Sequence, residues 1–157
     1  MQNLNLYLVP LFSIFLSYII GKLSNSRNLK IESLKDRYNN FYLPYMQLLI
    51  RASVKMPYMI TNPEIAIKFG DFLIEKSHYL ESKSSKFSIE YYYLELDYFE
   101  YFDGNPDFED AEIKINEFIV KASLEILKES TKVARQLKQP PISKTIYAHL
   151  SDQLNSK

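Results

Sequence analysis

The chain has 157 residues with 19 basic and 19 acidic side chains, two histidines and no cysteine. Without cysteine it has no disulfides, no thiolate catalysis and no cysteine-bound zinc. Its three scattered glycines exclude the glycine-rich loops that hold nucleotide phosphates, because both common loop types need clustered glycines.

Residues 1–21 contain no charged side chain. A helix over Leu4–Gly21 would be about 27 Å long, close to the roughly 30 Å hydrocarbon core of a bilayer. No small-residue cleavage site follows this apolar run. We therefore expect residues 1–24 to form a retained, single-pass transmembrane anchor (a signal anchor).

The flanking charges predict the orientation of this anchor. Lys22, Arg27 and Lys30 follow the apolar run before any acid, whereas the other flank has no lysine or arginine. The positive-inside rule then predicts an N-terminus outside the cell membrane and a cytoplasmic helical domain over residues 25–157.

The segment from Ile31 to Ala52 has the clearest helical periodicity of the body. Pro44 interrupts it and predicts a kink, because proline lacks an amide donor and crowds the preceding turn. Apolar side chains recur every three to four residues and predict one buried stripe: Ile31, Leu34, Tyr38, Phe41, Tyr42, Tyr45, Leu48, Leu49 and Ala52.

Two more segments follow. Met56-Pro57 and Thr61-Asn62-Pro63 indicate a turn, with Asn62 as the N-cap of a helix over about residues 63–80. Residues 82–88 are serine- and lysine-rich, and we expect a polar connector there.

Residues 88–102 are rich in aromatic side chains, which also suit strands, but their apolar spacing favours a helix. Residues 103–107 indicate a turn, after which Asn105 and Pro106 begin a helix to about Lys138. Its spacing predicts a buried face of Phe108, Ala111, Ile115, Phe118, Ala122, Ile126 and Val133. Ser143 is the expected cap of a last helix over 144–154. The fold class expected is all-α: the transmembrane helix followed by a bundle of about four or five helices.

Catalytic and cofactor motifs are missing from the sequence. Glu75 and His78 have the spacing of a di-iron ligand pair, but the other histidine, His149, has Ile146 where its acid should be. There is also no G-x-S-x-G motif. We expect no enzyme activity, no cofactor and no metal; an enzyme with a site hidden from motif analysis is the less favoured alternative.

An acidic, aromatic stretch is the candidate partner-binding surface. Ten acids and one base, Lys114, lie between Glu90 and Glu117. We expect Ile89, Tyr92, Tyr93, Leu96 and Phe99 to face the core, leaving tyrosines as exposed anchors and acids to steer a basic partner. The alternative is a solvated face with half of the aromatics in the core. The predicted partner-binding residues are Tyr91, Glu95, Asp97, Tyr98, Glu100 and Tyr101.

A basic stripe follows at Lys121, Lys128, Lys132 and Arg135. It could contact anionic lipid or nucleic acid. Glu117, Glu125 and Glu129 have spacings that pair with these bases, which favours a solvated, salt-bridged face. Without Lys22, Arg27 and Lys30 the chain has 16 basic against 19 acidic residues, so no specific nucleic-acid partner is expected.

These patterns favour a non-enzymatic, membrane-anchored interaction protein whose partners are the lipid bilayer and a protein at the membrane. A regulator or scaffold of a cellular membrane machinery is an alternative, and a pore-forming protein is disfavoured because the apolar run has no polar stripe. In layout, with one span and a small helical body, the chain resembles the membrane-anchored superinfection-exclusion proteins of prophages. The resemblance implies a role in blocking phage DNA entry and assigns no residue, and the sequence specifies no oligomeric state.

Overall fold

The computed structural model describes residues 4–53 and 63–155; within them, the side chains of residues 4–11, 14, 52–53, 63 and 153–155 are left out of the description. Every regular element in these ranges is helical, as the sequence predicts. The predicted turn at Met56-Pro57 and the predicted cap Asn62 lie outside the described residues. The chain divides into two units, Met1–Lys35 and Asp36–Lys157.

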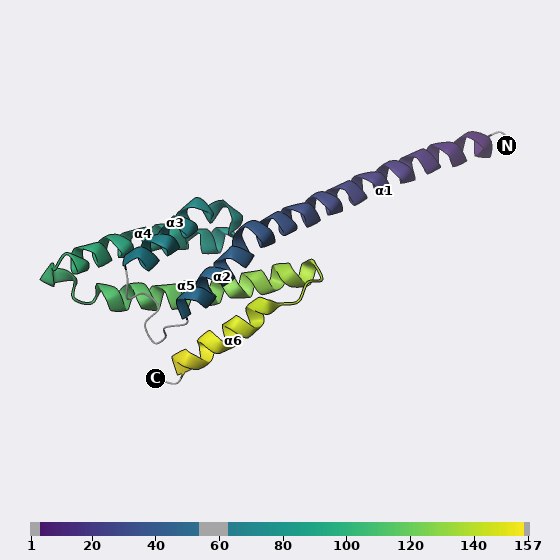
Figure 1. Cartoon of the computed structure of the whole chain (residues 1–157). Helices are drawn as coiled ribbons and strands as arrows, with labels where there is room; N and C mark the ends of the chain where they lie inside the picture. The colour runs from purple at the N-terminus through teal and green to yellow at the C-terminus, as the bar shows by residue number, and fades with distance from the viewer. Residues whose placement is uncertain (1–3, 54–62, 156–157) are drawn as a thin grey trace. The chain divides into compact units, whose positions relative to one another are not determined.

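The first unit contains most of helix α1, Leu4–Arg37, which continues well beyond the predicted apolar segment (Figure 1). Its described side chains from Phe12 to Lys30 are all exposed, including Phe15 and Ile20, each 59% exposed. Among the residues that the structure describes, none of the helices has the length and apolar character needed to cross a membrane. The predicted transmembrane anchor is thus unsupported by the structure.

The predicted interruption at Pro44 is preceded by a π-helical turn, η1, over Tyr38–Tyr42, near the start of the second unit. The amide of Leu43 donates to the carbonyl of Tyr38, five residues back. Because Pro44 has no amide to continue the regular ladder, a wider turn just before it accommodates the proline. Helix α2, Leu43–Ser53, follows.

The next elements are α3, Pro63–Glu75, the 3-10 turn η2, Ser77–Tyr79, and α4, Ser82–Phe102. Two predicted boundaries are wrong here. Helix α3 ends before Leu80, where the backbone is extended, and the expected connector over residues 82–88 forms the first turns of α4. Serines suit this position because Ser84 and Ser88 are buried, and their small side chains fit a close helix contact.

A 3-10 turn, η3, Pro106–Phe108, precedes the longest helix of this unit, α5, Ala111–Gln136, and α6, Ile142–Asn155, follows. Asn105 caps the 3-10 turn, not the long helix, by accepting from the amide of Asp107. Ser143 is not a cap: it lies inside α6, buried, with its hydroxyl 2.8 Å from that of Thr131.

Helix α5 is central to the second unit, with α4 and α6 packed along it and α3 against α4 (Figure 1). The stripe predicted around Pro44 is largely confirmed, since Phe41, Tyr42, Tyr45 and Leu49 are buried, while Leu48 is half-buried. The face predicted for α5 is also buried, except the preceding Phe108, which is half-buried. The hydroxyls of three core tyrosines, Tyr42, Tyr45 and Tyr91, have hydrogen-bond partners; that of Tyr45 lies 2.9 Å from the hydroxyl of Ser123.

Candidate functional site

Helix α4 is apolar on two opposite faces. One face packs in the core through Ser84, Phe87, Ser88, Tyr91 and Tyr98. The other, which we call the outer face of α4, spans an arc of about 100° at about 3.6 residues per turn. It consists of Ile89, Tyr92, Tyr93 and Leu96, which are 64%, 47%, 63% and 45% exposed.

The prediction that Tyr91 and Tyr98 are exposed anchors is therefore wrong, and so is the prediction that the outer face points to the core. Tyr91 is fully buried against the Phe118 ring, and its hydroxyl donates to the carbonyl of Ala66 at 2.8 Å. This burial raises the pKa of Tyr91. Tyr98 is 2% exposed, and Tyr101, half-buried, contacts it with ring centroids 6.3 Å apart.

The three acids predicted at this surface have different environments. Glu95 is half-buried against α3, so close that a Cβ atom at Gly70 would lie 2.7 Å from both of its carboxylate oxygens. Burial, helped by the charge of Asp71, raises the pKa of Glu95 to about 7. Asp97 is half-buried, whereas Glu100 is exposed and accepts a hydrogen bond from the side-chain amide of Asn105. Of these three acids, which were predicted to steer a partner from the surface, Glu95 and Asp97 are thus only partly accessible and Glu100 is exposed.

Negative charge around the outer face is mostly uncompensated. Ten acids lie between Glu90 and Glu117. Among the described residues, two of them form ion pairs: Glu90 with Lys86 at 3.6 Å, and Asp110 with Lys114 at 2.8 Å. Glu90 and Asp97 lie along one edge of the outer face by helical position, and Glu100 lies within it. An exposed apolar stripe beside Asp97 and Glu100, which form no ion pair among the described residues, suits a partner that carries both apolar and basic groups.

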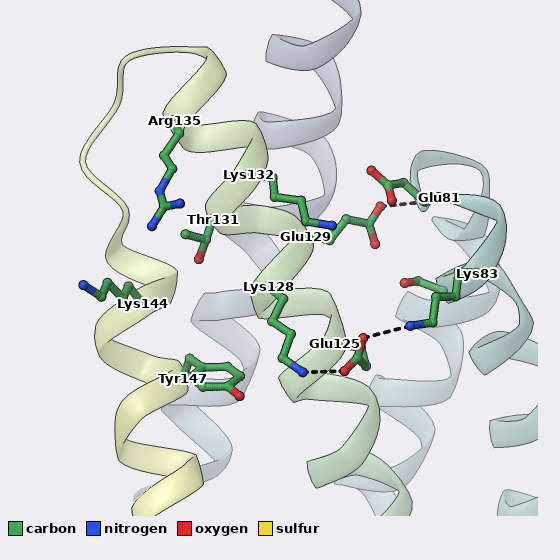
Figure 2. Close-up of a pocket in the computed structure, with 11 residues that line it drawn as sticks. Glu81, Lys83, Glu125, Lys128, Glu129, Thr131, Lys132, Arg135, Lys144 and Tyr147 are labelled. Carbon is green, nitrogen blue, oxygen red and sulfur yellow. Dashed lines mark hydrogen bonds and ion pairs between the residues drawn. The ribbon is translucent and has the colours of Figure 1, made fainter.

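A cavity, separate from the outer face of α4, lies where the start of α4 and helices α5 and α6 meet (Figure 2). This cavity, which we call the basic cleft, has a volume of about 430 Å³. Five cations line the basic cleft: Lys83, Lys128, Lys132, Arg135 and Lys144. Thr131, Tyr147 and the acids Glu81, Glu125 and Glu129 also line it.

Glu129, in the wall of the basic cleft, is 3% exposed and connects three parts of the fold. Its Oε1 atom accepts from Arg37 Nη2 at 2.7 Å, from the Tyr42 hydroxyl at 2.8 Å and from the Glu81 amide at 2.7 Å. Burial and the carboxylate of Glu129 raise the pKa of Tyr42. The Oε1 atom of Glu129 is thus a hub of hydrogen bonds that connects these parts of the fold, whereas its Oε2 atom is buried without a hydrogen-bond partner in the structure.

The expected salt-bridged basic stripe forms only in part. Glu125 pairs with Lys128 at 2.7 Å and with Lys83 of α4 at 3.4 Å. Glu129 turns inward to Arg37, so it does not compensate the stripe. Across the part of the chain that the structure describes, no ion pair involves Lys132, Arg135 or Lys144.

Sequence reasoning missed Lys144 and the role of Glu129. Lys144 belongs to another helix than the basic stripe, and no local pattern connects them. Glu129 had the spacing of an ordinary surface acid. The one available signal was its place in the buried face of α5, between Ile126 and Val133. No cluster of three or more potential metal-binding side chains occurs among the described residues.

Comparison with known proteins gives no match, whether to a protein-family model, a curated protein or a solved structure.

Proposed function

We propose that this protein is a non-enzymatic interaction module that binds a basic, amphipathic helix of a partner protein through the outer face of α4. The observation that carries the proposal is the second apolar face of this helix. A helix with two apolar faces normally buries both of them, yet Ile89 and Tyr93 on the outer face are both more than 60% exposed. A bound partner would remove this apolar surface from water.

The energetic argument favours a helix as the partner. The outer-face residues have the i, i+3, i+4, i+7 spacing of ridges that pack into the grooves on the surface of one facing helix. Burying a side chain of this size contributes about 1.5–3 kcal/mol, and less here because each is already partly covered. Four such contacts together are of the same order as the free-energy cost of association, about 4–15 kcal/mol, so the charged groups must add to recognition.

The charges favour a basic partner. Glu90, Asp97 and Glu100 border or interrupt the outer face, and one of the three, Glu90, has a cation within ion-pair distance among the described side chains. Lysine or arginine beside the apolar stripe of a partner would pair with them and speed association.

The test uses synthetic helical peptides of about 20 residues with a leucine stripe and either lysine and arginine or glutamate flanks. We expect the basic peptide to bind the full chain and the acidic one not to bind, measured by fluorescence anisotropy. The variant Ile89→Gln/Tyr93→Gln/Leu96→Gln should bind the basic peptide at least tenfold more weakly. Tyr93 and its neighbours are solvent-exposed, so helix content should be unchanged.

A matched control removes three exposed apolar side chains elsewhere, Ile67→Gln/Ile74→Gln/Ile113→Gln, which are 41%, 45% and 60% exposed. It should bind like the parent. Equal loss in both variants would contradict a specific role for the outer face. Reversing charge with Glu90→Lys/Asp97→Lys/Glu100→Lys should mainly slow association and weaken its salt dependence.

We further propose that the N-terminal segment holds the protein at a membrane. The support is the uncharged run Leu4–Gly21 followed by three cations, and the exposure of apolar side chains such as Phe12, 65% exposed, and Tyr18, 67% exposed. Contact with lipid would bury them.

We expect the full chain to sediment with membranes and a chain lacking residues 1–24 to stay in solution. A segment that spans the bilayer resists extraction at alkaline pH, whereas one that lies on the surface is released. Recovery of the full chain in the soluble fraction would contradict the proposal. A reporter fused after Lys157 tests the predicted cytoplasmic orientation, and plating of phage on cells that express the protein tests the superinfection-exclusion role implied by its layout.

A further inference from the structure

The basic cleft concentrates positive charge that the protein does not neutralise. Lys83 and Lys128 share Glu125, and Lys128 also lies over the Tyr147 ring, 5.7 Å from its centroid. Lys132, Arg135 and Lys144 have no such acid among the described residues. Like charges brought to one cavity repel one another, and an anion bound between them would relieve that repulsion.

The three cations are held on rigid elements. Lys132 and Arg135 are three residues apart and so share one face of α5. Lys144 comes from the first turn of α6, which is fixed to α5 by contact between the hydroxyls of Ser143, 1% exposed, and Thr131. Figure 2 shows Arg135 and Lys144 on one side of α5, and Lys132 extending the other way, toward Glu129 and Glu81. The helices fix where these side chains begin along the basic cleft, and their long stems let the charged groups turn toward a bound anion.

We propose that the basic cleft binds a phosphate group, carried either by a soluble phosphorylated small molecule or by an anionic lipid headgroup. One guanidinium and two ammonium groups match the charge and the several acceptor oxygens of a phosphate better than a single carboxylate. The volume of about 430 Å³ suits a small molecule or headgroup. Glu81, which forms no ion pair among the described residues, lines the α4 side of the basic cleft and repels a continuous phosphate backbone, which argues against nucleic acid.

The experiment titrates the full chain with pyrophosphate by calorimetry and compares its binding to phosphatidylglycerol and phosphatidylcholine vesicles. The cleft variant is Lys132→Gln/Arg135→Gln/Lys144→Gln. The control variant, Lys35→Gln/Lys68→Gln/Lys121→Gln, removes three exposed cations that do not line the basic cleft. Glutamine keeps helix propensity, so both should retain helix content.

Saturable pyrophosphate binding that falls at least tenfold in the cleft variant, and less than threefold in the control, supports a soluble ligand. A preference for phosphatidylglycerol that disappears only in the cleft variant supports a headgroup. Subtracting the phosphatidylcholine signal removes the apolar contribution of the N-terminal segment, and the contribution of its cations, Lys22, Arg27 and Lys30, is the same in the cleft variant and the parent. If the triple variant loses its fold, Lys144→Glu, at an exposed position, should still weaken binding at least threefold.

Two results would overturn the proposal. The first is that the full chain neither binds pyrophosphate nor prefers phosphatidylglycerol. The second is that the control variant loses as much binding as the cleft variant, which would indicate a general response to net charge. Both outcomes are independent of the outer face of α4, so they leave the proposed partner binding to its own test.

Discussion

Replacing Glu129 by alanine is expected to lower the free energy of unfolding by about 3–5 kcal/mol, the range found when one partner of a buried ion pair is removed. The loss arises because Arg37, whose side chain is 21% exposed, keeps a charge without its partner, and because the Tyr42 hydroxyl and the Glu81 amide lose their acceptor. For a domain of this size, such a loss is a large part of the total stability. Urea denaturation of the full chain, followed by circular dichroism, measures it.

Glu125→Ala is the matched control, because Glu125 lies one turn earlier on α5 and pairs with two exposed lysines. Exposed pairs contribute about 0–1 kcal/mol, so this variant should stay within about 1 kcal/mol of the parent. Glu129→Gln should fall between the two, since its carbonyl oxygen can still accept while the charge is lost. Equal stability of the Glu129→Ala and Glu125→Ala variants would show that Glu129 is not a hub.

Replacing Glu95 by glutamine is expected to stabilise the fold at pH 8 and to have little effect near pH 4. The pKa of Glu95 is raised from 4.5 to about 7, so the folded state holds this proton more tightly than the unfolded chain. The contribution of Glu95 is therefore most favourable below about pH 4.5 and is lost as the pH rises through about 7.

The expected gain at pH 8 is about 1–2 kcal/mol. The full shift would correspond to roughly 3 kcal/mol, but solvent screens the carboxylate because Glu95 is only half-buried. The measurement is urea denaturation of parent and variant across this pH range. Glu100→Gln, at an exposed position of the same helix, is the control and should show no such pH-dependent difference. A Glu95→Gln gain that does not depend on pH would indicate that packing, not ionisation, is responsible.

The sequence by itself determined the helical class and the buried faces of the segments with one apolar stripe. In α5 the apolar positions recur on one side while charges occupy the other, so Ile115 and Ile126 could be assigned to the core from spacing alone. Spacing alone likewise assigned Phe41, before Pro44, and Tyr45, after it, to the core. Local geometry was enough because only one face of each helix could be buried.

Tertiary structure decided the rest. Helix α4 has apolar side chains on both faces, so periodicity could not choose between them, and hydrophobicity favoured the wrong one. The face that packs against the neighbouring helices carries small serines and Tyr91, whose hydroxyl donates to the Ala66 carbonyl on α3. The partners of Glu129 were equally hidden, since Arg37 is 92 residues away in the chain. The basic cleft combines α4, α5 and α6 and exists only once they pack, because local sequence patterns describe one helix at a time.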